Sequence, residues 1–294
     1  MQTRNFLLDI QWLKQEWRFV QAHPVEPFSL ETKTNGLLHS EAAKVHEALA
    51  DDGVKKYSML SLMTELKTKS GRSLVKFRDV VSGVLRCGML NDAVIDMGVT
   101  MIAESVQGCV AFSSLSMVVE WPTPPRQWLS ETPYIIVPLH LSTNHWGVII
   151  VEIGFPTTLK VYFYEPLHQE CYRKEISNAW KNGLLPYLEK WHIASGAKEC
   201  FPKEIITKWI SEPTQPDLKS CGVMVLGIVY AYVRNTYRFE RHLVTDAYLS
   251  VMRLRLAWLL LCSTERAPPS DYNLVEMQTT DQEISNVLKP QRST

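Results

Sequence analysis

The sequence lacks the marks of several large classes of protein. Its 31 Lys and Arg residues balance its 31 Asp and Glu residues, so no net charge attracts nucleic acid or an anionic membrane. Its longest apolar run, residues 221–233, is shorter than the roughly 20 residues that a membrane-spanning helix needs. Residues 1–30 carry Asp9, Glu16 and Glu26 among their apolar positions and make a poor signal peptide. We therefore expect neither nucleic acid nor a membrane as a partner.

A disulfide framework and a zinc site are also missing. His168, Cys171 and Cys200 are the best metal-ligand candidates, but no second pair has metal-site spacing, so we assign no metal and no cofactor. The pattern suits a reducing compartment, and we expect the protein in the nucleus, the cytoplasm or both. Six cysteines lie far apart without a CxxC pair: Cys87, Cys109, Cys171, Cys200, Cys221 and Cys262.

Composition divides the chain into three segments. The polar stretch 67–73 is the best boundary, so we expect a helical accessory segment at 1–72 and a larger domain at 73–265. From residue 266 the composition turns polar, and we expect a disordered tail at 266–294. The apolar spacing of the accessory segment predicts helices at 5–20, 37–50 and about 54–67.

The larger domain mixes strand and helix patterns. β-branched residues predict strands at 134–141, 145–153 and 159–164, the last two joined by a hairpin turn at 154–156. Asn91 or Asp92 can cap a helix that runs to about Glu104. Other helical patterns lie at about 172–194, 202–210, 221–233 and 243–262.

Cys221 is the best candidate for a nucleophile. It begins a long apolar helix, where unpaired N–H groups and the helix dipole stabilise a thiolate. Gly222 behind it lets a substrate backbone approach closely. For Cys109 and Cys262 the simpler interpretation, a small buried hydrophobe, is sufficient.

A thiol nucleophile needs a base, and the base needs an acid that fixes its tautomer. Among the eight histidines, His145 and its rival His140 lie in the strand region. A turn centred on Phe155 would place Glu165 directly opposite His145 across two antiparallel strands. Glu152 is the alternative acid, but its position on the strand puts it on the opposite face from His145.

Three motifs carry a resemblance to a known family. His145 is followed by Trp146, Gln215 precedes Cys221 by six residues, and Leu90-Asn91-Asp92-Ala93-Val94-Ile95 is similar to a Trp-Leu-Asn-Asp-x-x-Ile motif. In this order the residues resemble the ubiquitin-like-specific (SUMO or sentrin) cysteine proteases and their adenovirus-endopeptidase relatives. The resemblance covers roughly residues 75–262.

The resemblance implies an α+β, papain-like fold of the SUMO-protease type. It has a mixed central sheet, the nucleophile at the start of a buried helix, and here a helical N-terminal segment. Gln215 would stabilise the oxyanion. The chain departs from the SUMO proteases in having Glu165 instead of Asp and Met89 instead of the first Trp of the motif. Residues expected to contact the substrate are Trp146, Met89, Asn91, Asp92 and Gly222.

The function implied is cleavage after the C-terminal glycine of a ubiquitin-like modifier by a Cys-His-Glu triad, with the modifier and its conjugates as partners. The domain at 73–265 would be the protease. Two alternatives stay open: acetyl transfer by the same triad, and an inactive module that binds a ubiquitin-like protein. The sequence indicates neither the modifier nor the oligomeric state.

Overall fold

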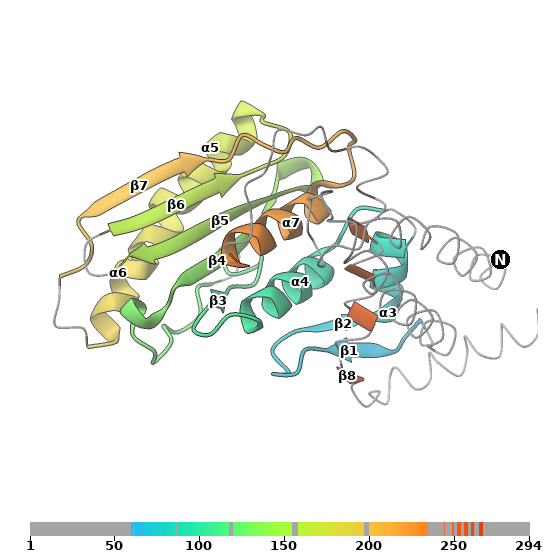
Figure 1. Cartoon of the computed structure of the whole chain (residues 1–294), viewed down its shortest axis with the longest axis horizontal. Helices are drawn as coiled ribbons and strands as arrows, with labels where there is room; N and C mark the ends of the chain where they lie inside the picture. Colours follow the sequence, from blue (N-terminus) through green and yellow to red (C-terminus); the bar gives the residue numbers. More distant parts are fainter. Residues whose placement is uncertain are drawn as a thin grey trace, which may run out of the picture. The chain divides into compact units, whose positions relative to one another are not determined.

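The computed structural model describes residues 60, 62–85, 88–117, 120–154, 158–196 and 200–234, and shorter stretches at 244, 249, 252–253, 256–257, 260–261 and 265–266. The chain divides into two compact units, one of Ile95–Asp246 and the other of Met1–Val94 with Ala247–Thr294 (Figure 1). The helices expected at 5–20 and 37–50 and the tail beyond residue 266 lie outside the described residues. The three expected domain ranges stay predictions.

The unit Ile95–Asp246 is built on a five-stranded mixed sheet in the order β3-β4-β5-β6-β7. The two central pairings, β4 with β5 and β5 with β6, are antiparallel, and both outer pairings are parallel. The three predicted strands are confirmed, since they form β4, β5 and β6. The bounds are β3 (Val110–Ala111), β4 (Tyr134–Leu141), β5 (His145–Gly154), β6 (Thr158–Tyr164) and β7 (Glu204–Trp209).

The register of the β5–β6 hairpin differs from the prediction. Val148 pairs with Tyr164, and Gly154 pairs with Thr158, so three residues separate the strands and the turn is centred one residue later than Phe155. The strands are consequently shifted by two residues relative to the expected alignment. A shift of two residues keeps every side chain on its predicted face, because the side-chain period of a strand is also two.

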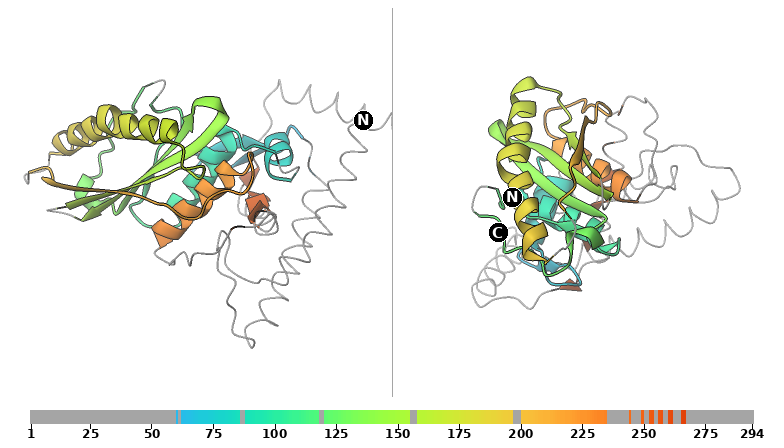
Figure 2. Two further views of the ribbon diagram at one scale, coloured as in Figure 1. Left: turned by 90° about the horizontal axis from the view of Figure 1, so that it is seen from above. Right: turned by 90° about the vertical axis from the view of Figure 1, so that its left-hand side faces the viewer.

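Two helical layers cover the sheet (Figure 2). On one face lies a nearly continuous helix formed by α5 (Glu170–Ala179), the π-helical turn Trp180–Leu184 and α6 (Leu185–Ala194), as predicted for 172–194. On the other face lies α7 (Cys221–Arg234), which packs against β5 and is buried from Cys221 to Ala231, as the apolar run predicted.

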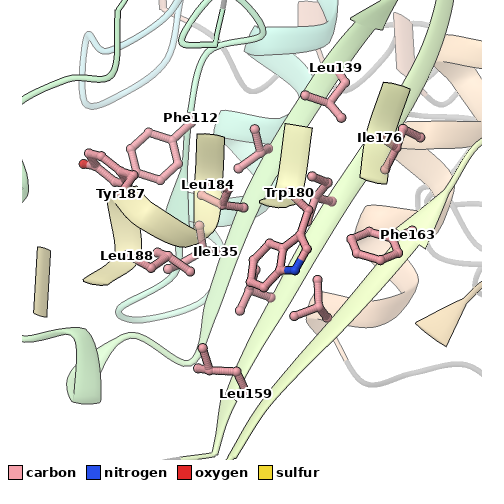
Figure 3. Packing of buried hydrophobic residues seen from close by; sticks show 14 of the residues in the cluster. Phe112, Ile135, Leu139, Leu159, Phe163, Ile176, Trp180, Leu184, Tyr187 and Leu188 are labelled. Atoms are coloured by element: carbon pink, nitrogen blue, oxygen red, sulfur yellow. The ribbon is translucent and has the colours of Figure 1, made fainter. Parts of the chain in front are cut away.

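The core under α5 and α6 fixes the sheet to these helices. Trp180 and Leu184 project from the helical layer onto the strands, where Ile135, Leu159 and Phe163 meet them (Figure 3). Each of these five side chains is less than 5% exposed, so each contributes about 1.5–3 kcal/mol of apolar burial. This packing makes the sheet a rigid base for residues at its ends.

The prediction of a helix at 202–210 is wrong, because Glu204–Trp209 forms the edge strand β7. Ile205, Ile206 and Thr207 are β-branched and suit an extended strand that pairs in parallel with β6. Residues 204–209 form a strand because they pair with the edge of β6, and the local pattern alone did not indicate this pairing.

The other unit carries a small sheet of β1 (Glu65–Lys67), β2 (Leu74–Lys76) and β8 (Glu265–Arg266). The stretch 67–73, predicted as a boundary, is the turn between β1 and β2, and the predicted helix at 54–67 is wrong at its end. The described residues of the predicted 243–262 helix are buried, and those from Leu249 on are helical. Shorter elements are α3 (Phe77–Asp79), the π-helix Val80–Leu85 and the start of α4 (Asp92–Glu104).

Among the described residues, none of the helices has both the length and the apolar character needed to span a bilayer.

Candidate active site

The predicted nucleophile, Cys221, is the first residue of α7 and is fully buried. The loop before it is fastened by Asp217, whose carboxylate accepts hydrogen bonds from the backbone N–H groups of Lys219 and Ser220 at 3.1 and 2.9 Å. The Ser220 hydroxyl donates a third, at 2.7 Å. Short-range side-chain bonds of this kind fix turns before helices. They hold Cys221 at the start of α7.

His145 is the first residue of β5, and its imidazole lies beside Glu165, just beyond the end of β6. Nε2 of His145 is 3.2 Å from Oε2 of Glu165, and the two side chains are 4% and 0% exposed. The backbone N–H of Leu167 donates to the same carboxylate oxygen at 3.0 Å. With the observed register, Glu165 is a diagonal neighbour of His145 across the two strands, which is still within reach of long side chains.

The thiol of Cys221 also acts on the His145 side chain and raises its pKa. Burial lowers the pKa of His145, but the hydrogen bonds to Cys221 and Glu165 and the negative charge of both groups outweigh burial and raise this pKa to about 9. The imidazole is therefore the protonated partner at neutral pH whenever the thiol is ionised. This electrostatic arrangement is the one a thiol nucleophile requires.

The second oxygen of Glu165 has a different environment. Within the described part of the chain, Oε1 has no hydrogen-bond partner, and Nε of Arg173 lies 3.9 Å from it. The Arg173 guanidinium lies over the Trp209 ring, 5.1 Å from its centre. A cation held in this way compensates part of the cost of burying the carboxylate.

Glu152, the alternative acid, lies elsewhere in the sheet. Its carboxylate accepts hydrogen bonds from Nζ of Lys160 at 2.9 Å and from the Tyr162 hydroxyl at 3.0 Å. Of the two acids, the structure thus places Glu165 beside His145.

Gln215 lies in the loop before α7, is 8% exposed, and donates its backbone N–H to the carbonyl of Pro166 at 3.0 Å. That bond ties the loop to the chain that follows Glu165. Nε2 of Gln215 donates to the carbonyl oxygen of Asp217 at 2.5 Å. An amide nitrogen carries two hydrogens, so one such bond leaves a second N–H for another acceptor.

Trp146 is 2% exposed and stands opposite His140 on β4, with ring centres 4.8 Å apart. Gly222, behind the thiol, is buried in α7.

Met89, Asn91 and Asp92 belong to the other unit. The side-chain oxygen of Asn91 accepts the N–H of Val94 at 3.1 Å, so Asn91 caps α4, whose first residue is Asp92. Met89 is exposed. The roles in substrate contact expected for Trp146, Gly222, Met89, Asn91 and Asp92 stay predictions.

Sequence reasoning missed two neighbours of the site. Tyr172 stacks on the His145 ring, and Arg173 approaches Glu165. Both come from the start of α5, where Tyr172 and Ile176 lie on the buried face one turn apart. Their spacing marked an amphipathic helix, but nothing local indicated which of its residues would meet His145.

The comparison with known families decides the identification. The model of the Ulp1 protease family, C-terminal catalytic domain, matches residues 115–259. These residues belong to the Ulp1 protease family. The matched span contains His145, Glu165, Gln215 and Cys221, and the Ulp1-family domain is a cysteine protease domain.

Solved structures agree on the fold of this chain. It is similar to the C-terminal Ulp1 protease domain solved in complex with Smt3, the yeast ortholog of SUMO, with 20% identity over 80% of this chain and 98% of that chain and a TM-score of 0.55. It is also similar to the Ulp1-like SUMO protease catalytic domain of Chaetomium thermophilum, with 17% identity over 78% of this chain and 94% of that chain and a TM-score of 0.53. No curated protein matches the sequence significantly. The similarity confirms the predicted papain-like fold of the SUMO-protease type.

The described residues include no group of three or more His, Cys, Asp or Glu side chains arranged to hold a metal ion.

Proposed function

We propose that the Ulp1-family domain hydrolyses the bond after the C-terminal glycine of a ubiquitin-like modifier, SUMO or a close relative, in a precursor or in a conjugate with lysine. The observation that carries the proposal is the buried His145 imidazole, which lies 3.2 Å from Glu165 and whose pKa is raised by both Cys221 and Glu165. The fold shared with a Ulp1 protease domain solved in complex with Smt3, the yeast ortholog of SUMO, supports the choice of modifier.

In the first half of the reaction, His145 takes the proton of Cys221, and the thiolate sulfur attacks the carbonyl carbon of the glycine. A tetrahedral oxyanion forms. It collapses with cleavage of the C–N bond as the imidazolium of His145 gives its proton to the leaving amine. Glu165 orients the imidazole through the 3.2 Å contact and stabilises its charged form.

In the second half, His145 takes a proton from water, and the resulting hydroxide attacks the thioester carbonyl. The C–S bond breaks, the thiolate of Cys221 is regained, and the modifier leaves with a free carboxylate. In both halves of the reaction, the oxyanion would accept hydrogen bonds from the remaining side-chain N–H of Gln215 and from the backbone N–H of Cys221.

Modifier-based vinyl sulfone probes test this proposal. The wild-type chain, treated separately with SUMO– and ubiquitin–vinyl sulfone, should gain the mass of one SUMO probe, located at Cys221 by peptide mass spectrometry. Cys221→Ala should abolish the adduct. Cys171→Ala is the matched control, because Cys171 is an exposed free thiol of the same chain, and it should retain full labelling.

The outcomes separate the alternatives. An adduct that survives in Cys221→Ala would remove the assignment of the nucleophile. Binding of SUMO without adduct formation by the wild type would indicate an inactive binding module. No binding and no adduct, together with acetylation of Cys221 by acetyl-CoA, would favour acetyl transfer.

A further inference from the structure

The aromatic ring of Tyr172 covers the imidazole of His145. The two ring centres are 4.4 Å apart and the ring planes differ by 24°, so the rings are stacked. Both side chains are buried, and Tyr172 comes from the first turn of α5. A stacked ring restricts rotation of its neighbour, and here that neighbour must keep one nitrogen in line with Glu165.

The same tyrosine is tied to the turn that leads into His145. Its hydroxyl and Oγ1 of Thr143 form a hydrogen bond of 2.5 Å. Thr143 and Asn144 both have φ of 57°, a left-handed conformation that is unfavourable for a β-branched residue such as threonine. Contacts from outside must therefore maintain this turn.

Glu175, one turn further along α5, supplies a second attachment. Its carboxylate accepts the backbone N–H of Ser142 at 3.0 Å and the Ser142 hydroxyl at 2.5 Å. The start of α5 thus holds the turn 142–144 at two points, through Tyr172 and through Glu175, and places an aromatic face on the first residue after the turn.

We propose that Tyr172 is a positioning residue for His145: its ring sets the plane of the imidazole, and its hydroxyl, through Thr143, sets the backbone from which the imidazole projects. The proposal rests on the function proposed above. The π face of a tyrosine also attracts a cation, so the stack favours the imidazolium that the reaction needs over the neutral ring.

Several groups besides Tyr172 bear on the charge of His145, and a titration must be interpreted with all of them in view. Cys221 and Glu165 raise the pKa of His145 directly. Arg173 lies beside Glu165. His168 also interacts with Glu165, and its own pKa is lowered mainly by burial and further by the charge of Arg173. These four groups are unchanged in the variants below.

Substitution of Tyr172 separates the two contributions. Tyr172→Leu keeps the site apolar but removes both the π face and the hydroxyl. It should lower kcat/KM for SUMO–aminomethylcoumarin about 10²-fold, the usual effect of a misplaced reacting group. It should also lower the pKa of His145, followed by imidazole NMR, by roughly half a unit. Tyr172→Phe keeps the stack and should leave that pKa unchanged, with a loss in kcat/KM of about three- to tenfold.

Tyr187→Leu is the matched control. Tyr187 is also buried in the helical layer, but it stacks on Trp121, with ring centres 4.7 Å apart, and takes no part in the site. It should cost stability while leaving kcat/KM and the pKa of His145 at their wild-type values.

The proposal would be overturned if Tyr172→Leu and Tyr187→Leu had the same pKa of His145 and the same kcat/KM, because Tyr172 would then only fill space. The NMR titration does not depend on the modifier. If the wild type cleaves no modifier but Tyr172→Leu still lowers the pKa of His145, the proposed function fails while the positioning of His145 by Tyr172 stands.

Discussion

The two ends of the paired strands β5 and β6 each hold a carboxylate, and the two carboxylates have opposite surroundings. Glu165 is 1% exposed and faces the imidazole of His145. Glu152 has a side chain that is 30% exposed, and it bonds Lys160 and Tyr162 at the edge of an open pocket of about 420 Å³. One sheet thus carries a buried acid paired with a histidine and a solvated acid paired with a lysine.

The difference shows how burial strengthens the effect of a carboxylate on its partner. The Glu152–Lys160 pair is solvated, and pairs of that kind contribute about 0–1 kcal/mol. Water does not screen Glu165 in the same way, so its charge acts strongly on His145 and helps to raise the pKa of the imidazole to about 9. Glutamate therefore forms a solvated ion pair at one end of the strands and has a proposed catalytic role at the other.

The largest expected difference between the two ends concerns the carboxylates themselves. Glu165→Gln keeps the shape of the side chain but removes the charge that orients and stabilises the imidazolium, and it should lower kcat/KM by about 10³- to 10⁴-fold. Glu152→Gln should leave kcat/KM within about twofold of the wild-type value, because it breaks only a solvated ion pair. Equal losses in steady-state cleavage of SUMO–aminomethylcoumarin would refute the assignment of Glu165.

Packing should differ between the ends as well. A Cβ added at Gly147 would lie 2.7 Å from Cδ1 of Ile176, whereas one at Gly154 would lie 3.4 Å from its nearest neighbour, an ordinary contact. Gly147→Ala should therefore lower the free energy of unfolding by about 1–3 kcal/mol. Gly154→Ala should change it by less than about 0.5 kcal/mol. Urea denaturation of both variants measures the difference, and a tolerated Gly147→Ala would mean that the His145 end is loosely packed.

The cations beside the two acids should give the smallest difference. Arg173 is 3.9 Å from the unbonded oxygen of Glu165, so Arg173→Gln should lower kcat/KM about three- to tenfold by making the buried carboxylate less favourable. Lys160→Gln should leave kcat/KM unchanged. Arg173→Lys, which keeps the charge, should recover part of the loss. An Arg173→Gln variant with wild-type kinetics would limit Arg173 to packing on Trp209.

The sequence was sufficient to predict those parts of the fold whose pattern is local. β4 begins and ends at the predicted residues, because its β-branched residues are consecutive and buried. Asn91 was expected as one of two possible caps for α4, and it is the residue that accepts the Val94 N–H. The assumed hairpin predicted His145 and Glu165 as neighbours, although its register was off by two residues.

What the sequence did not predict depends on contacts between distant segments. β7 is a strand because the edge of β6 is available to pair with it, and the pattern of 204–209 alone resembled a helix. The stacking of Tyr172 on His145 depends on how α5 crosses the sheet, which no residue spacing specifies. The sequence likewise did not indicate the number of residues between β5 and β6, and the register depends on that number.

The pH dependence of kcat/KM tests the central claim most directly, namely that the charge of Glu165 controls His145. Because this pKa is raised to about 9, the imidazolium proposed to protonate the leaving amine persists at neutral pH and is lost as pH rises through about 9. Wild-type activity should therefore fall with a midpoint near pH 9. The midpoint should move to lower pH in Glu165→Gln and stay in place in Glu152→Gln. One common midpoint in all three proteins would contradict the account.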